Sequence, residues 1–265
     1  MLRLKPSVGK LARFKTNGEL LPVFDLKQVT QQFDRLLALD RITLQIYPGE
    51  RVALVGSSGA GKSTLLQLLN GTASPTQGEV WAMGHNLNHL SVKQLRQVQR
   101  QIGTIYQQFH LVNNLQVIHN VNAGHLGRWS FGKAALSLLY PFDRQAAAKA
   151  LQRVGIPEKL YERTDRLSGG QQQRVAIARV LVQNPTVILA DEPVSSLDPQ
   201  LSREIMDLLR DLVQESGKTL VVSLHSIELS RSHCDRMIGL RHGQIFFDAP
   251  PHQVSDRMIA ELYHS

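Results

Sequence analysis

The sequence predicts an α/β fold with a mixed sheet core, an antiparallel β subdomain and an inserted helical subdomain. Short apolar runs alternate with helical patterns, as in a sheet that is covered by helices. Two stretches of alternating apolar and polar residues before residue 47 indicate antiparallel strands. The segment from 109 to 165 contains amphipathic stretches and a clear helical pattern, which predicts the helical insert.

Composition is typical of a globular protein. The 265 residues are enough to bury a substantial core. The sequence contains no run of about eighteen apolar residues, so it predicts no membrane-spanning helix. The single cysteine, Cys234, excludes an internal disulfide, and we expect it to be a small buried side chain. The net charge of +8 suits nucleotides, a nucleic acid or an anionic membrane surface. Nucleic acid is disfavoured, because no zinc-finger spacing, aromatic platform or basic recognition helix is visible.

Residues 1–21 are predicted to be a basic, solvated tail, and residues 22–265 the folded domain, with the helical subdomain at about 109–182. The tail has no continuous apolar segment, so we do not interpret it as a secretory signal. Much of the excess positive charge lies on Arg3, Lys5, Lys10, Arg13 and Lys15.

Two strands with a turn between them are predicted from Pro22 to Ile46. We expect Phe33 on the loop that joins them. A half-exposed sheet edge is the ordinary interpretation, but an aromatic ring at this position can also stack on a base.

The stretch from 51 to 70 predicts an apolar strand, a glycine-rich turn and a helix from Thr64 onward. The turn matches G-x-x-x-x-G-K-[ST] at every fixed position, which indicates a phosphate-binding loop. Its backbone N–H groups would face the phosphates, Lys62 would hold the β- and γ-phosphates, and the Ser63 hydroxyl would bind Mg²⁺. A flexible turn without a ligand is the alternative. The loop residues are Gly56, Ser57, Ser58, Gly59, Ala60, Gly61, Lys62 and Ser63.

A polar helix is predicted at 91–100 and a strand at 102–106. Gln107 follows this strand, where a side chain can reach a nucleotide site. His85 and His89 are four residues apart and would bind metal only on a helix with further ligands. Because no carboxylate or cysteine accompanies them, we expect a solvated surface pair.

Residues 167–174, LSGGQQQR, predict a Ser/Gly turn that opens a helix through Val182. Ser168 is the expected N-cap residue. With the free N–H groups of the first helical turn, it also forms a second anion site. Two phosphate sites with only one nucleotide loop suggest a dimer, in which each site is completed by the other copy.

The apolar strand 187–190 ends in Asp191 and Glu192. Two acids at the end of a buried strand are costly unless a cation meets them. We expect Asp191 to bind Mg²⁺ and Glu192 to accept a proton from an attacking water. His225 ends the strand 219–224, where a packed histidine is the ordinary interpretation and contact with the γ-phosphate the functional one.

In this order, the residues from about 22 onward resemble the ATP-binding subunits of ABC transporters. The motif LSGGQQQR makes the resemblance specific, and VILADE at 187–192, Asp198 and His225 stand at the corresponding positions. The resemblance implies that Phe33 stacks on adenine and that Gln107 contacts Mg²⁺ and senses the permease. It implies ATP contacts by Thr64 and Asp198. It also implies that the ATP of the opposite subunit is contacted by Ser168, Gly169, Gly170 and Gln171.

Within this family, the chain is most similar to the phosphonate importer ATPases. The residues that carry this likeness are YQQFHLVNNLQVIHNV at 106–121, GHLGRWSFGKAALSLL at 124–139 and DEPVSSLDP at 191–199. The step Gly127-Arg128-Trp129 resembles one found in those proteins. Ser226 departs from the Gln, Asp or Asn that related proteins often carry, and the tail before Leu20 has no counterpart.

The resemblance implies an ATPase that energises uptake of phosphonates, phosphite or phosphate esters, with ATP and Mg²⁺ as cofactors. It implies a homodimer, integral-membrane permease subunits, an extracytoplasmic solute-binding protein and a peripheral location on the cytoplasmic face of the inner membrane. No nucleic acid partner is expected. The permease is expected to dock on the segment after Gln107, through residues 108–140.

Other classes remain open. Polar amino-acid import and lipoprotein release are the alternatives within transport. An ABC ATPase acting on nucleic acid would explain the basic charge, but such proteins usually carry paired cassettes or long coiled-coil inserts, and neither is predicted here. A P-loop kinase would share Lys62 and Asp191, yet it has no use for LSGGQ.

Overall fold

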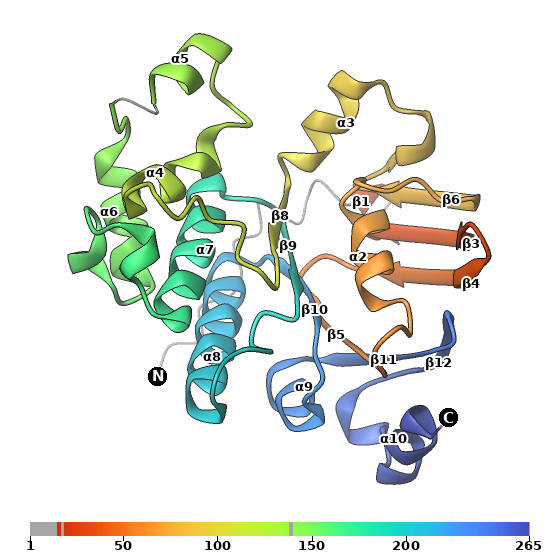
Figure 1. The fold of residues 1–265 in the computed structure, drawn as a ribbon. Coiled ribbons are helices and arrows are strands. Elements are labelled where there is room, and N and C mark those ends of the chain that lie inside the picture. The colour runs from red at the N-terminus through yellow and green to blue at the C-terminus, as the bar shows by residue number, and fades with distance from the viewer. Residues whose placement is uncertain (1–14, 17–18, 138–139, 265) are drawn as a thin grey trace.

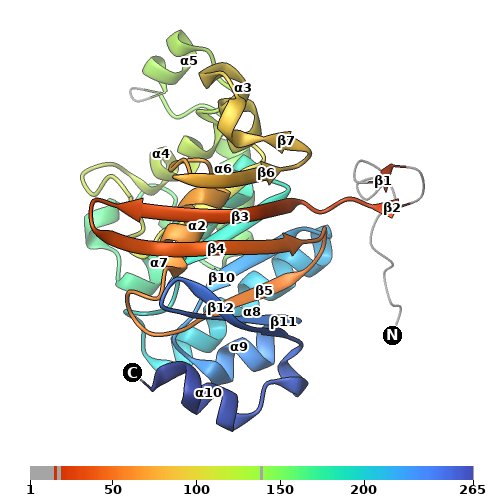
Figure 2. The same ribbon diagram turned by 90° about the vertical axis from the view of Figure 1, so that its right-hand side faces the viewer.

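The chain forms a central sheet, a smaller antiparallel sheet and a group of helices (Figure 1). The computed structural model describes residues 15–16, 19–137 and 140–264. Most of the predicted basic tail, including Arg3, Lys5, Lys10 and Arg13, lies outside the described residues. Its described part is a small ladder of β1 (Lys15–Thr16) with β2 (Glu19–Leu20), which projects from the rest of the molecule in Figure 2.

The central sheet confirms the predicted mixed core. Its six strands have the order β12-β11-β5-β10-β9-β8, and all neighbouring pairs are parallel except β11 with β12. The strands are β5 (Arg51–Val55), β8 (Ile102–Ile105), β9 (Val187–Asp191), β10 (Thr219–Ser223), β11 (Arg236–Arg241) and β12 (Gln244–Ala249).

The second sheet has the strand order β4-β3-β6-β7 and is entirely antiparallel. Its strands are β3 (Phe24–Phe33), β4 (Leu36–Ile46), β6 (Gln77–Ala82) and β7 (His85–Asn86). The expected loop position of Phe33 is wrong. Phe33 is the last residue of β3 and pairs with Leu36, because the hairpin turn contains only two residues between these strands. Its side chain is nevertheless 45% exposed.

His85 and His89 do not share a helix. His85 begins β7, and His89 ends the short 3-10 helix η2 (Leu87–His89). Both residues are exposed, as expected for a solvated pair. Within the described ranges, no group of three or more His, Cys, Asp or Glu residues is placed to hold a metal ion.

Four helices that come between β8 and β9 in the sequence gather at one end of the molecule, on the left in Figure 1. They are α4 (Val117–Asn122), α5 (Phe131–Leu136), α6 (Arg144–Arg153) and α7 (Gly169–Gln183). A 3-10 turn, η3 (Ala123–His125), follows α4. The remaining α-helices are α2 (Lys62–Leu69), α3 (Val92–Gln99), α8 (Pro199–Ser216), α9 (Ile227–His233) and α10 (Asp256–Tyr263). Three more 3-10 turns are η4 (Pro157–Lys159), η5 (Thr164–Arg166) and η6 (Pro251–Gln253).

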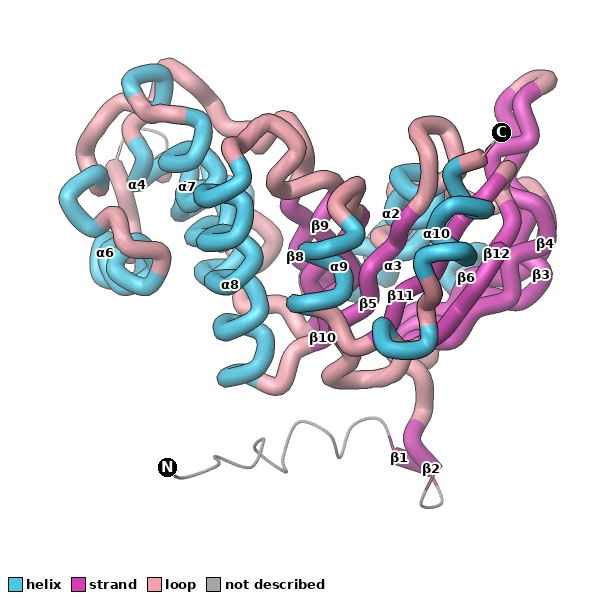
Figure 3. The backbone as a smooth tube through the Cα atoms, turned by 90° about the horizontal axis from the view of Figure 1, so that it is seen from below, coloured by secondary structure: helices cyan, strands magenta, loops and turns pink. Residues whose placement is uncertain are grey.

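The central sheet separates two hydrophobic cores, because successive side chains of a strand point to opposite faces. On β9, Ile188 and Ala190 pack into the core that contains α7 and α8, whereas Val187 and Leu189 pack into the core with α2 and the antiparallel sheet. Figure 3 shows these layers on either side of the strands. Both faces are buried, which explains why the strand reads as a continuous apolar run.

Cys234 is buried, as predicted, and this burial raises the pKa of its thiol to about 12. The thiol therefore stays protonated and unreactive at neutral pH. Across the described ranges, none of the helices combines the length and the apolar character needed to cross a membrane.

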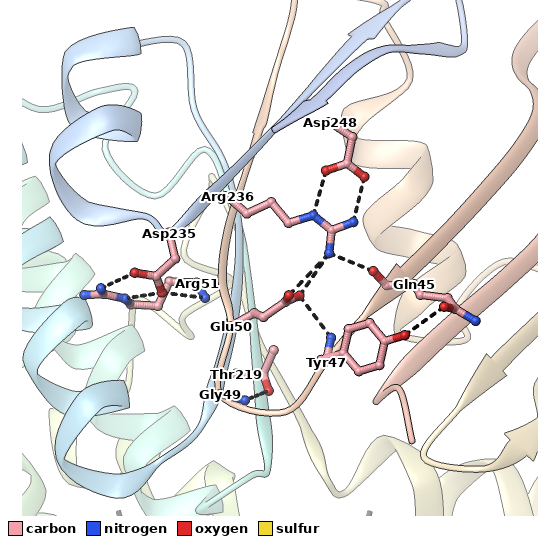
Figure 4. Close-up of polar contacts among 9 residues, drawn as sticks. All are labelled: Gln45, Tyr47, Gly49, Glu50, Arg51, Thr219, Asp235, Arg236 and Asp248. Atoms are coloured by element: carbon pink, nitrogen blue, oxygen red, sulfur yellow. Dashed lines mark hydrogen bonds and ion pairs between the residues drawn. The ribbon is translucent and has the colours of Figure 1, made fainter. Parts of the chain in front are cut away.

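Arg236 joins the two sheets through charged hydrogen bonds (Figure 4). Its guanidinium donates two bonds of 2.6 Å to Asp248 and one of 3.1 Å to Glu50 Oε2, and Nη1 donates to the Gln45 carbonyl at 2.9 Å. Its side chain is 21% exposed. The hydrogen bonds that Arg236 donates to Asp248 raise the pKa of the Arg236 guanidinium. Residues from β11, β12 and both ends of the β4–β5 connection thus share one cation.

We predict that Arg236→Gln destabilises the fold, because Asp248 and Glu50 lose their cation while half-buried. The free energy of unfolding should fall by about 1.5–3 kcal/mol, measured from urea unfolding curves. Arg257→Gln is the matched control, since its pair with Glu261 is exposed; we expect no measurable change in the free energy of unfolding. Equal effects of the two substitutions would contradict the importance of the network.

Candidate functional site

The glycine-rich loop runs from the end of β5 into α2. Gly56, Gly59 and Gly61 all have positive φ angles, of 147°, 81° and 104°. A Cβ atom on Gly56 would lie 2.2 Å from the Leu240 carbonyl oxygen, and one on Gly61 would lie 2.6 Å from that of Ala38. Only glycine fits at these two positions, so the backbone curls closely enough to surround an anion.

The helix after the loop begins at Lys62 and not at Thr64, as the sequence pattern suggested. Lys62 and Ser63 therefore belong to its first turn, where free N–H groups and the positive end of the helix dipole attract anions. The Lys62 side chain is 5% exposed and donates to the carbonyls of Gly56 at 2.8 Å and Ser57 at 3.0 Å. Burial lowers the pKa of Lys62, and the charges of Glu192 and Asp191 oppose that shift. The loop thus carries a cation inside its curve.

Two serines bond to Asp191. Ser63 Oγ donates to Asp191 Oδ1 at 3.1 Å, and Ser223 Oγ donates to the same oxygen at 2.8 Å. The contact between Ser223 and Asp191 follows from strand register, because Ser223 of β10 lies opposite Asp191 of β9. The first helical turn after the loop and the end of β9 therefore meet, as the sequence predicts for a shared metal site.

Glu192 and His225 form a pair beside Asp191. His225 Nε2 lies 2.6 Å from Glu192 Oε1, and the Glu192 side chain is 17% exposed. Ser223 Oγ also accepts a hydrogen bond of 2.8 Å from the Glu192 N–H. Glu192 has a φ angle of 46°, the left-handed region that non-glycine residues rarely adopt. Ser223 thus orients both acids. The sequence analysis missed Ser223, because its place opposite Asp191 depends on the register of β10 with β9, which leaves no local pattern.

The signature residues cap α7. Ser168 Oγ accepts from the Gln171 N–H at 3.3 Å, and Gln171 Oε1 accepts from the Ser168 N–H at 3.1 Å, so the predicted N-cap is part of a full capping box. A Cβ on Gly170 would lie 2.3 Å from Leu201, so the glycine allows α7 to approach α8 closely. Gly169 packs less tightly, near Leu197.

Asp198 caps α8, accepting hydrogen bonds from the N–H groups of Gln200 at 3.1 Å and Leu201 at 3.0 Å. In the described part of the chain, no hydrogen bond links Asp198 or the α7 cap to the phosphate loop. One chain therefore carries two groups of candidate residues. One is the loop with Asp191, Glu192 and His225, and the other is the start of α7 with Asp198.

Gln107 lies in an exposed turn after β8. Among the described residues, its side chain makes no hydrogen bond with Ser63 or Asp191. The turn itself is held by Arg179 of α7, which donates to the carbonyls of Phe109 at 2.8 Å and His110 at 2.7 Å. Arg179 was not predicted, because a contact across 69 residues leaves no local pattern.

Comparison with known proteins places the chain in a large family. The ABC transporter family profile matches residues 39–195. The phosphonates import ATP-binding protein PhnC of Lactobacillus gasseri is 45% identical over 244 residues, which cover 92% of this chain and 94% of that protein. A second relative, the phosphonates import ATP-binding protein PhnC 3 of Halalkalibacterium halodurans, is 46% identical over 225 residues, covering 85% and 87%.

Solved structures of ATP-binding cassettes have a similar fold. A dimeric ATP-binding cassette in a post-hydrolysis state, bound to ADP and Pi, is 34% identical, with a TM-score of 0.74 over 86% of this chain and 98% of that chain. The cbiO1 protein of Clostridium perfringens, part of the ABC transporter complex cbiONQ, is 29% identical, with a TM-score of 0.77 over 91% and 93%. The predicted fold class is thereby confirmed. The chain belongs to the ABC transporter family and is an ATP-binding ATPase subunit of that family.

Proposed function

We propose that this chain hydrolyses ATP to energise the uptake of phosphonates, with phosphite and phosphate esters as related solutes. The Glu192–His225 pair, fixed beside Asp191 and the phosphate loop, carries the hydrolytic part of the proposal. The solute class rests on relatives that are named phosphonates import ATP-binding proteins and align over most of the chain.

Lys62 and the loop N–H groups are proposed to hold the ATP phosphates, with Thr64 beside them and Phe33 stacking on the adenine. The free N–H groups at the start of α2 stabilise negative charge, and the buried ammonium neutralises part of it. The half-exposed ring of Phe33 offers a face for the base.

Ser63 and Asp191 are proposed to hold Mg²⁺ together with Gln107. Their oxygens lie 3.1 Å apart and are hard donors of the kind that this ion prefers, so the donor set fits. The ion would neutralise charge on the phosphates when bound there.

Glu192 is proposed as the general base. Its carboxylate accepts a proton from the attacking water, and His225 holds the carboxylate at 2.6 Å and adds polar stabilisation near the γ-phosphate. Ser223 keeps the backbone of Glu192 and the side chain of Asp191 in one arrangement.

Two copies are proposed to form a head-to-tail dimer around two ATP molecules. A relative at 34% identity is dimeric with ADP and Pi bound, which supports this arrangement. In the dimer, the cap of α7 (Ser168, Gly169, Gly170 and Gln171) and Asp198 would complete the site of the opposite copy. ATP phosphates that contact both chains would hold the two copies together. Hydrolysis would remove this bridge, and the two copies would separate.

The solute pathway is proposed to belong to integral-membrane permease subunits, with an extracytoplasmic solute-binding protein delivering the solute. The chain would act at the cytoplasmic face of the inner membrane. Residues 108–140 are the proposed permease contact, since the turn after Gln107 is bonded to α7 through Arg179.

We predict that Glu192→Gln lowers ATP turnover by about 10²–10⁴-fold, the contribution of a general base, and leaves ATP binding intact. Single-turnover hydrolysis and nucleotide titration separate the two effects, and gel filtration with ATP should reveal a trapped dimer. Glu215→Gln is the control, since that exposed acid pairs with Arg153 and is not part of the candidate site. Unchanged turnover in Glu192→Gln would remove Glu192 from the role.

We predict that Lys62→Ala weakens nucleotide binding, the step before hydrolysis, because the buried cation of the loop is lost. Equilibrium titration with a fluorescent ATP analogue measures this effect. Lys149→Ala, on α6, is the matched control. Normal affinity of the Lys62 variant would contradict the phosphate-loop assignment.

Growth on single phosphorus sources tests the solute. Cells that lack this chain and redundant transporters should fail on a phosphonate and grow on phosphate, and only the wild-type chain, not Lys62→Ala, should restore growth. Growth on phosphonate, phosphite and phosphate alike would overturn the phosphonate assignment and leave the ATPase assignment untouched.

A further inference from the structure

A groove between α3 and the segment before α5 has no role in the proposed ATP site. Its volume is about 470 Å³, within the range of small-ligand pockets. In Figure 1, α3 and α5 stand at the same end of the molecule. We call this site the arginine groove. Its walls are Arg96, Gln99, Arg100, Ala123, Gly124, Leu126, Gly127, Arg128, Trp129 and Gln183.

The arginine groove is strongly positive. Three arginines line it, and no acidic residue is among its lining residues. Within the described ranges, neither Arg96 nor Arg100 has a carboxylate partner, whereas Arg153 and Arg174 each pair with a glutamate. Arg128 donates to the Gln183 carbonyl, and no ion pair with an acidic side chain is found for it in the described part of the chain. Like charges in one groove repel each other, and an anion would relieve that repulsion.

The groove is also shaped by specific contacts. A Cβ on Gly127 would lie 3.1 Å from Cγ of Arg100, so the glycine allows the arginine stem to pass closely. The Trp129 ring stacks on His125 at 5.2 Å, and the Lys133 ammonium lies 4.7 Å from its centroid. Trp129 is therefore held in place, with Arg128 beside it in the chain.

We propose that the arginine groove binds a phosphate or phosphonate group. Guanidinium groups bind such oxyanions with paired, charge-assisted hydrogen bonds, and three of them without acidic partners favour a group of more than one negative charge. The group can belong to a free anion or to a lipid headgroup. The site does not depend on the proposed import function.

A bound oxyanion would bridge two parts of the molecule. Arg96 and Arg100 belong to α3 and its C-cap, whereas Arg128 follows η3 in the helical group. The two parts already meet at Gln183 of α7, whose side-chain amide donates to the carbonyl of Arg100, the C-cap of α3, at 3.3 Å. An anion in the groove would add a second link across the same junction.

Trp129 provides the signal for a direct test. The chain has two tryptophans, so Trp81→Phe leaves Trp129 as the only reporter. Inorganic phosphate or methylphosphonate is titrated in the presence of a saturating non-hydrolysable ATP analogue and Mg²⁺, so that the phosphate loop and its γ-phosphate position are already occupied. We expect a saturable change in Trp129 fluorescence, weakened by added salt.

Arg100→Gln and Arg128→Gln should each weaken this binding by about 10- to 100-fold, the loss expected for hydrogen bonds to a charged group. Both arginines are exposed, so the variants should fold, which thermal unfolding checks. Arg153→Gln is the matched control, because it removes the same charge from α6 outside the groove. We expect it to bind as the parent does.

Vesicles distinguish the source of the anion. Sedimentation with phosphatidic acid vesicles, but not with phosphatidylcholine vesicles, that depends on Arg100 and Arg128 would identify a lipid headgroup; a response to the free anions alone would identify a free ligand. No saturable response to either source would overturn the proposal. Equal binding by Arg100→Gln, Arg128→Gln and Arg153→Gln would also overturn it.

Discussion

The parallel pairing of β9 with β10 is the constraint on which the candidate site depends. Their register sets Ser223 opposite Asp191, so one hydroxyl bonds to the Asp191 carboxylate and to the Glu192 N–H. A shift by one residue would turn every side chain of β10 to the other face and separate these groups. The register is secured in turn by the two cores, because Leu220 and Val222 pack on one face and Val221 on the other.

The phosphate loop is held by the same sheet. Gly56 lies against the Leu240 carbonyl of β11, and Gly61 against the Ala38 carbonyl of the antiparallel sheet. The loop is therefore enclosed by backbone from both sheets, and Arg236 fastens those sheets together at a distance from the loop. The candidate site residues at the strand ends are thus held in place by core packing and by charge pairing between the two sheets.

Much of this arrangement was predictable from the sequence because its signals are local. The fixed glycines and Lys62 define the loop, and the apolar runs define the buried strands to within about one residue. Phe33 was misplaced because a two-residue hairpin turn leaves no separate loop, and the start of α2 was set too late because glycine and serine obscure the first turn. Ser223, Arg179 and Arg236 could not be predicted. Their partners lie 32, 69 and up to 191 residues away, and only the folded chain brings them together.

The left-handed backbone of Glu192 has a consequence for how this protein tolerates change. An L-residue with a side chain in that region costs about 1–2 kcal/mol, which glycine or asparagine would largely avoid. A screen for thermal stability alone would therefore favour replacing the proposed general base, although our proposal expects the replacement to lower turnover. At position 192, selection for a stable fold and selection for ATP hydrolysis act in opposite directions. Stabilising substitutions should therefore be sought at other positions.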